Sequence, residues 1–348
     1  MNEDKIVFSL KILKKFINNS LGLNYEKFDV TGYELLFPIL EASSHETYVE
    51  TISDKADTFY RRIKESTISM MEYAYIHNMK NISMKFKLNE KPVILAFDYT
   101  DEDFYGEVQG FDIHGWTGEN GVKGKFKFLT CSVVSDEIPQ KIPLISVPIS
   151  IGHFKSHVIN HCLSKIKPLV GEIKLILFDR GFYENDLMFE LTKSNYPYLI
   201  FVPKREEYKQ FFEELEDKKT VFVKDYTFQK DMSTQKGSTY LAFLKQIYDP
   251  KSKRDYDWIF ATNVEEIVLG DMLTQYKKRW RIETSFRVQD EARIKCKSTD
   301  MKIRYFIFLF EQFLQVQWIC FYKEEASFKE FIIKLSEMSK NWTKNQGK

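Results

Sequence analysis

The chain has 348 residues, 43% of them hydrophobic, which is enough for one large domain or two ordinary ones with a buried core. The net charge of +1 excludes a surface that is basic throughout, although a local basic groove remains compatible with it. Four scattered cysteines without a Cys-x-x-Cys pair, and an N-terminus without a signal peptide, predict a cytoplasmic protein.

Residues 1–88 are expected to form a helical N-terminal region. Apolar residues recur at helical spacing from Ile6 onward, and the stretch from Glu46 to Met79 contains few helix breakers. The first 80 residues hold ten basic and twelve acidic side chains, so this region has no basic stripe.

The next part of the chain predicts alternating strands and helices. Short apolar runs at 93–98 and 173–179 are typical of interior strands. Two further strands are expected at 107–117 and 124–135, and helices at 155–169 and 184–193. The resulting order is β-β-β-α-β-α.

Both interior strands are expected to end in an aspartate, Asp98 and Asp179. Ligands of open α/β sheets bind at the carboxyl ends of the strands, so these acids are candidate site residues. Taken singly, an aspartate in such a place is more often a turn or helix-cap residue.

The region from 205 to 255 is rich in β-branched and aromatic residues and predicts several strands, with a short charged helix at 205–219. A late apolar stretch, Tyr305 to Tyr322, is interrupted by polar residues. It therefore predicts a core helix rather than a membrane span, within a helical C-terminal segment at 305–348.

A basic segment between these regions places Tyr276, Arg279, Glu283 and Arg287 on one stripe of a predicted helix. A carboxylate flanked by guanidinium groups suits a metal-bound phosphate. The alternative is an exposed helix with i,i+4 ion pairs. Between Asp271 and Arg304, ten basic residues stand against five acidic ones, so the basic charge is concentrated here.

Together these three segments resemble the catalytic blocks of DDE transposases, the enzymes of bacterial and archaeal insertion sequences. The spacing of Tyr276, Arg279 and Glu283 matches the branch with a Tyr-x2-Arg-x3-Glu-x6-Lys signature, but Asp290 stands where that signature has lysine. The resemblance covers about residues 92–300. It implies an α/β fold: a ribonuclease-H-like mixed sheet with flanking helices and a β-rich insertion before the third acid. The catalytic domain would span 89–304, with the insertion at about 205–255.

The resemblance also implies the site chemistry. Asp98, Asp179 and Glu283 would hold Mg²⁺, with Mn²⁺ as a substitute, and Asp98 would bridge two ions. Tyr276 and Arg279 would hold a DNA phosphate. Arg287 is a candidate for the missing cation, and Arg180 and Lys204 are further phosphate-binding candidates, with solvated surface charge as the alternative for each.

The partners implied are double-stranded DNA, as transposon ends and as target, and further copies of the chain in a dimer or larger synaptic complex. Residues 1–88 would then bind transposon ends or mediate dimerisation. Two other functions stay open: a decayed or domesticated DNA-binding protein, favoured by Asp290, and a ribonuclease-H-like nuclease without strand transfer.

Two other groups of residues have both a functional and a structural interpretation. His153, His157 and His161 recur at helical spacing, but the His-Glu-x-x-His pattern is absent, which favours structural histidines over a metal site. Trp258 and Trp280 are candidate platforms for stacking a base, and core packing is favoured for both.

Overall fold

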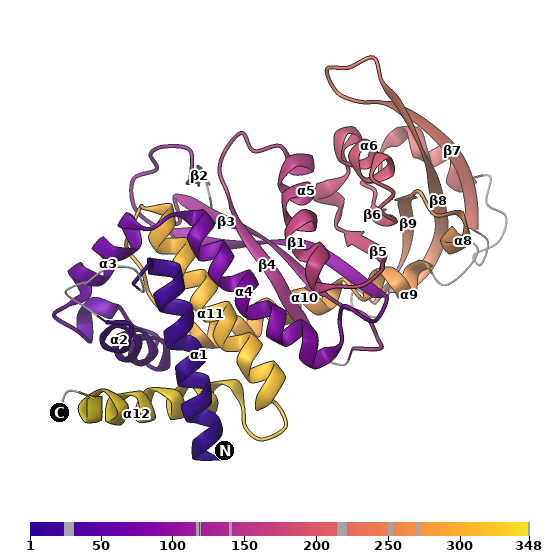
Figure 1. Cartoon of the computed structure of the whole chain (residues 1–348). Helices are drawn as coiled ribbons and strands as arrows, with labels where there is room; N and C mark the ends of the chain where they lie inside the picture. Colours follow the sequence, from indigo (N-terminus) through magenta and orange to yellow (C-terminus); the bar gives the residue numbers. More distant parts are fainter. Residues whose placement is uncertain are drawn as a thin grey trace.

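The computed structural model describes residues 1–348 except 24–30, 116–117, 119, 139–140, 214–220, 250–252, 269–271 and 347–348. Its helices lie on both sides of a central sheet (Figure 1). They are α1 (Glu3–Leu21), α2 (Gly32–Ser44), α3 (Ala56–Glu65), α4 (Ile68–Phe86), α5 (Lys155–Ile166), α6 (Asn185–Lys193), α7 (Lys209–Glu213), α8 (Glu265–Val268), α9 (Met272–Lys277), α10 (Trp280–Gln289), α11 (Met301–Phe321) and α12 (Phe328–Gln346).

The described strands form one nine-stranded mixed sheet in the order β2-β3-β1-β5-β6-β9-β8-β7, with β4 also paired to β3. The strands are β1 (Val93–Phe104), β2 (His114–Gly115), β3 (Gly124–Val133), β4 (Ile142–Ile149), β5 (Ile173–Phe178), β6 (Tyr198–Phe201), β7 (Val221–Gln229), β8 (Lys236–Asp249) and β9 (Arg254–Thr262). The predicted α/β class with a mixed sheet and flanking helices is confirmed.

The parallel pairing of β1 with β5 sets the position of the two predicted aspartates. Phe97 lies opposite Phe178 in this register, so Asp98 and Asp179 follow at neighbouring positions, as predicted. The prediction that the first strand ends at Asp98 is wrong. Its fully buried run stops at Phe97, but β1 continues to Phe104 because β3 pairs with it along that whole length.

The predicted strand at 107–117 is also wrong in extent. Only the two residues of β2 are paired there, and 116–117 lie outside the described residues. The third long antiparallel strand is β4, which contains Pro143 and Pro148. These prolines are tolerated because β4 pairs only with β3, leaving its other edge unpaired by any described strand. The hydroxyls of Tyr75 and Tyr305 donate to β4 carbonyls at 3.0 and 2.7 Å.

The strands expected between 205 and 255 are present as β7, β8 and β9. They extend the central sheet, because β9 pairs antiparallel with β6. The helix predicted at 205–219 begins as a 3-10 turn at Glu206–Tyr208 that leads into α7, and 214–219 lie outside the described residues.

Helices from the two ends of the chain pack together against one face of the sheet (Figure 1). The predicted helical character of the N-terminal region and the predicted core helix α11 are both confirmed. Aromatic rings connect α11 with the N-terminal helices and with the sheet. The ring centroid of Phe16 in α1 lies 5.1 Å from that of Phe313 in α11, and the Phe128 ring of β3 stacks on Phe308 with the centroids 4.2 Å apart. No described helix is long and apolar enough to span a membrane.

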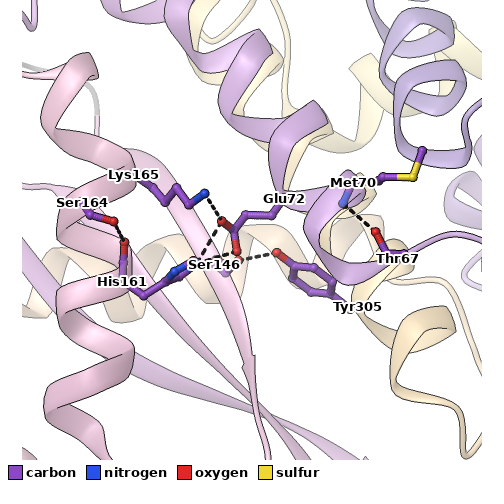
Figure 2. A network of polar contacts seen from close by, with 8 residues as sticks. All are labelled: Thr67, Met70, Glu72, Ser146, His161, Ser164, Lys165 and Tyr305. Atoms are coloured by element: carbon purple, nitrogen blue, oxygen red, sulfur yellow. Dashed lines mark hydrogen bonds and ion pairs between the residues drawn. The ribbon is translucent and has the colours of Figure 1, made fainter.

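A buried carboxylate links the N-terminal helices to the helix behind the sheet. Figure 2 shows Glu72 of α4 accepting a hydrogen bond from His161 of α5 at 2.9 Å, with Lys165 at 3.7 Å. The Glu72 side chain is only 8% exposed, so a charged partner stabilises it. These contacts give His161 the structural role that the sequence favoured.

Candidate active site

The helix predicted to carry the site is interrupted. Helix α9 ends at Lys277 and α10 begins at Trp280, so the prediction of one continuous helix is wrong. The amide of Arg279 donates to the Tyr276 carbonyl at 2.9 Å, and the Ile282 amide to the Arg279 carbonyl at 3.0 Å. These i→i−3 bonds tighten the chain as in a 3-10 turn and bring residues three apart onto one side.

Arg279 in this turn connects the three predicted acids. Its Nη1 donates to Asp98 at 2.8 Å and its Nη2 to Glu283 at 3.0 Å. Its Nε donates to the Tyr276 hydroxyl at 3.2 Å, and that hydroxyl donates to Asp179 at 3.3 Å. Residues from β1, the end of β5 and the α9–α10 region therefore form one hydrogen-bonded group.

Burial makes it costly to keep the carboxyl groups of this hydrogen-bonded group charged. Asp98 is mostly buried, and that burial raises the pKa of its carboxyl to about 6, against the opposing effect of Arg279. Asp179 and Glu283 raise the same pKa further, so the three acids repel one another. Burial also raises the pKa of Tyr276, so its hydroxyl stays protonated as a donor.

The guanidinium compensates this negative charge. Burial by itself lowers the pKa of Arg279, but the neighbouring Tyr276, Asp98 and Asp179 raise it above its usual value. Arg279 is 4% exposed, so it forms part of the interior of the site rather than a solvated surface charge.

Carboxylate oxygens are the ligands that Mg²⁺ and Mn²⁺ prefer, so the donor set of Asp98, Asp179 and Glu283 fits a hard divalent cation. In the part of the chain that the structure describes, no three acid, histidine or cysteine side chains lie close enough together to hold a metal ion. The three acids have the ligand chemistry that a divalent cation needs. In this structure the Arg279 guanidinium supplies the positive charge between Asp98 and Glu283.

The interrupted helix is held from outside the site by an ion cluster that sequence analysis missed. Asp136, after β3, lies 2.7 Å from Lys278 and 2.7 Å from Arg281, on either side of Arg279. Arg281 also donates to the Val134 carbonyl at 3.0 Å. The residues are more than 140 positions apart, so no local pattern in the sequence indicates this contact.

Lys141 lies next to this ion cluster, and its pKa provides a test of the electrostatics there. Burial, then Arg281, lower the pKa of Lys141 to about 8. Below pH 8 the amine is charged in both folded and unfolded chains, and folding is penalised by about 1 kcal/mol at most because the amine is partly solvated. The penalty fades as pH rises from 8 to its unfolded value near 10.5. Lys141→Met should therefore raise the melting temperature at pH 7 but not at pH 10.5; an equal gain at both would contradict this.

The other predicted site residues lie outside the hydrogen-bonded group. Arg287 is exposed on α10, and Arg180 is exposed in the turn after Asp179. Lys204 lies 3.5 Å from Asp257 and above the Tyr256 ring. The position where the resembling signature has lysine holds an exposed carboxylate, Asp290.

Both tryptophans pack against other rings. Trp258 is 5% exposed and stacks on Phe260, with the ring centroids 5.9 Å apart. The Trp280 ring lies 6.4 Å from the Trp258 ring. The Trp258 ring also lies 6.0 Å from the Tyr276 ring and so packs against the hydrogen-bonded group. These contacts agree with the expectation of core packing.

The three histidines line one hollow of about 460 Å³ between α4 and α5. Each side chain with a described contact is used structurally: His161 bonds Glu72, and His153 accepts a hydrogen bond from the Ser150 amide at 3.2 Å. Among the described residues, no three possible metal ligands lie close enough together there to hold an ion.

Comparison with known proteins supports the same class of enzyme. Residues 155–310 match the family model of the transposase DDE domain, a stretch that includes Asp179 and Glu283. No curated protein sequence matches the chain. The chain is similar in structure to a piggyBac transposase in a synaptic complex with hairpin DNA, with a TM-score of 0.53 and 13% identity over 95% of this chain and 77% of that one.

At this identity, the structural likeness establishes the fold, which is consistent with a ribonuclease-H-like arrangement. The family match and the shared fold together support a DDE-type transposase. The narrower branch with the Tyr-Arg-Glu-Lys signature remains a prediction.

Proposed function

We propose that the chain is a DNA transposase that cuts at transposon ends and joins the freed 3′-hydroxyl to target DNA. The observation that carries this proposal is one hydrogen-bonded group built from three segments distant in the sequence. Arg279 bonds Asp98 and Glu283 directly, and Asp179 joins them through the Tyr276 hydroxyl. Folding does not require three acids at one point, since their mutual repulsion opposes it.

The three acids would hold Mg²⁺ or Mn²⁺, which, when bound, activates an oxygen nucleophile and stabilises the leaving oxygen of a phosphodiester. The chain's own residues supply the surroundings. Tyr276 keeps its proton and can donate a hydrogen bond to a phosphate oxygen, and Arg279 can bind two phosphate oxygens at once. The aromatic layer around Trp258 excludes water from behind Tyr276.

A basic stripe follows the catalytic helix and marks a path for DNA. In the segment after α10, Arg293, Lys295 and Lys297 are exposed, whereas Ile294 and Cys296 between them point inward. The Lys295 amide donates to the Thr47 carbonyl at 3.0 Å, which fixes the segment to the N-terminal helices.

The stripe borders a hollow of about 890 Å³ that also reaches the end of β1 at Glu102, Asp103 and Phe104. Alternate residues of an extended chain are about 6.6 Å apart, which is about twice the 3.4 Å rise per phosphate along the axis of one DNA strand. The hollow is also lined by Glu46, Glu102, Asp103 and Glu107, so a DNA strand would follow the three basic side chains rather than fill the hollow.

Replacing Arg293, Lys295 and Lys297 together by glutamine should weaken DNA binding in a salt-dependent way. Three lost phosphate contacts should reduce the slope of log affinity against log salt by about 2 to 3. A matched triple replacement of the exposed Lys167, Lys174 and Lys193, which lie outside both the stripe and residues 1–88, is the control and should leave the slope unchanged. Equal slopes for both triple variants would remove the stripe from the DNA path.

Two transposon ends must be brought together before joining, so the active form should be a dimer or larger assembly on double-stranded DNA. The second candidate function is a DNA-binding protein without turnover. Asp290, exposed where the resembling signature has a lysine, is the observation that favours it.

The test uses labelled duplexes copied from the DNA that flanks the gene, with Mg²⁺ or Mn²⁺, and the wild type beside Asp179→Asn. Metal-dependent nicks and joined products from the wild type alone support a transposase. Nicks without joined products identify a hydrolytic nuclease, and specific binding without nicks identifies the DNA-binding alternative.

A further inference from the structure

All three nitrogens of the Arg279 guanidinium are engaged inside the site. They donate to Tyr276, Asp98 and Glu283 at 3.2, 2.8 and 3.0 Å. The residue is 4% exposed, and a guanidinium cannot lose its proton in a protein. The site therefore contains a permanent cation that bonds two of the three carboxylates proposed to hold metal.

A divalent ion bound by Asp98 and Glu283 would compete with this cation for the same oxygens. The two positive charges would also repel each other strongly, because the site is largely removed from water. Both cannot keep their full set of contacts. Arg279 must leave at least one carboxylate before a metal ion can use it.

An incoming DNA phosphate gives Arg279 an alternative partner of the same charge and geometry. Phosphate, like carboxylate, accepts two parallel hydrogen bonds from a guanidinium. Arg279 lies in the interrupted stretch between α9 and α10, where the main chain makes i→i−3 bonds rather than regular α-helical ones. The neighbours that fix this turn, Lys278 and Arg281, are bound to Asp136 and can remain in place while the Arg279 side chain moves.

We infer that Arg279 is an internal counter-ion that keeps the metal site closed until a DNA phosphate draws the guanidinium away from Asp98 and Glu283. Metal loading and DNA binding are thereby coupled. Because coupling is reciprocal, DNA tightens metal binding by the same factor by which metal tightens DNA binding. The DNA half of this inference rests on the proposed function; the competition between Arg279 and the metal does not.

The matched control for Arg279 is Arg281. It carries the same side chain two residues further along, is 37% exposed at the side chain, and pairs with Asp136 and the Val134 carbonyl instead of the three acids. Arg281→Gln removes an equal charge from the same region and leaves the bonds of Arg279 to the carboxylates in place, because Lys278 still holds the turn through Asp136. Any general effect of net charge on metal affinity appears in both variants.

The experiment measures Mn²⁺ binding to the full chain by electron paramagnetic resonance, with and without a duplex from the flanking DNA. Without DNA, Arg279→Gln should bind Mn²⁺ about tenfold more tightly than the wild type, within the usual range of coupling. Arg281→Gln should resemble the wild type. Asp98→Asn combined with Glu283→Gln should lose the same Mn²⁺ signal, which assigns it to this site.

A second test uses the wild type alone and therefore does not depend on whether a variant folds. Its Mn²⁺ affinity should rise about tenfold when duplex is present. Equal affinity with and without bound duplex, or an Arg279→Gln affinity no higher than that of Arg281→Gln, overturns the inference. If no duplex binds, the proposed function and the DNA half of the inference both fail, whereas the DNA-free comparison still decides whether Arg279 opposes the metal.

Discussion

Asp98→Asn is expected to lower metal-dependent DNA cleavage by about a thousandfold or more. The neutral amide removes one of the anionic oxygens that would hold the catalytic cations, whose contribution to the transition state is several kcal/mol, and about 4 kcal/mol corresponds to that factor. The substitution changes little in size. It also removes the charge that pairs with Arg279 at 2.8 Å. Cleavage of a labelled duplex in single-turnover conditions measures the effect.

Asp101→Asn is the matched control for this variant, because it makes the same chemical change three residues further along β1. Asp101 lies 3.2 Å from Lys125 and takes no part in the hydrogen-bonded group around Arg279. Its cleavage rate should stay within a few-fold of the wild type. If Asp98→Asn cleaved as fast as Asp101→Asn, Asp98 would have no catalytic role.

Phe313→Ala is expected to destabilise the whole chain by about 3–5 kcal/mol, the usual effect of deleting a buried ring. Phe313 is 1% exposed in α11 and lies 5.1 Å from Phe16 of α1 and 6.0 Å from Tyr75 of α4. Because one ring joins helices from both ends of the chain, unfolding should remain a single transition shifted to lower denaturant. Circular dichroism against urea concentration measures it.

Phe8→Ala is the control for this prediction. Phe8 also belongs to α1 and contacts a ring of α11, Phe321, but it is 54% exposed, so its removal should cost far less. Two separated transitions in Phe313→Ala, with cleavage activity retained between them, would contradict the prediction. They would show that residues 1–88 fold as an independent unit.

The placement of two acids could be predicted from the sequence because it depends on local patterns. The apolar runs before Asp98 and Asp179 indicate buried strands, and buried strands of this kind pair in parallel. Their neighbouring positions then follow from the register. Tyr276, Arg279 and Glu283 were grouped correctly although the helix is interrupted, because residues three and four apart share a side in both α and 3-10 geometry.

Other features depend on contacts between distant parts of the chain and left no local signal. The turn at Lys278 and Arg279 is fixed by Asp136, and the direction of Arg279 by Asp98, 181 residues earlier. Strand β4 was not predicted, and its two prolines are acceptable in a strand only because β4 pairs on one side with β3. The sequence therefore indicated the members of the hydrogen-bonded group, but not that Arg279 bonds the acids themselves. It also placed Arg287 on the same stripe, although that side chain is exposed outside the group.

The most direct test of the central claim is the joining of a pre-cut DNA end to a plasmid. A labelled end with a free 3′-hydroxyl bypasses cleavage and reports phosphoryl transfer alone. With Mg²⁺, the wild type should produce label joined to plasmid, and Asp179→Asn should produce none above background. Joined product at equal yield from both proteins, or from the wild type in excess chelator, would contradict a metal-dependent site built on these three acids.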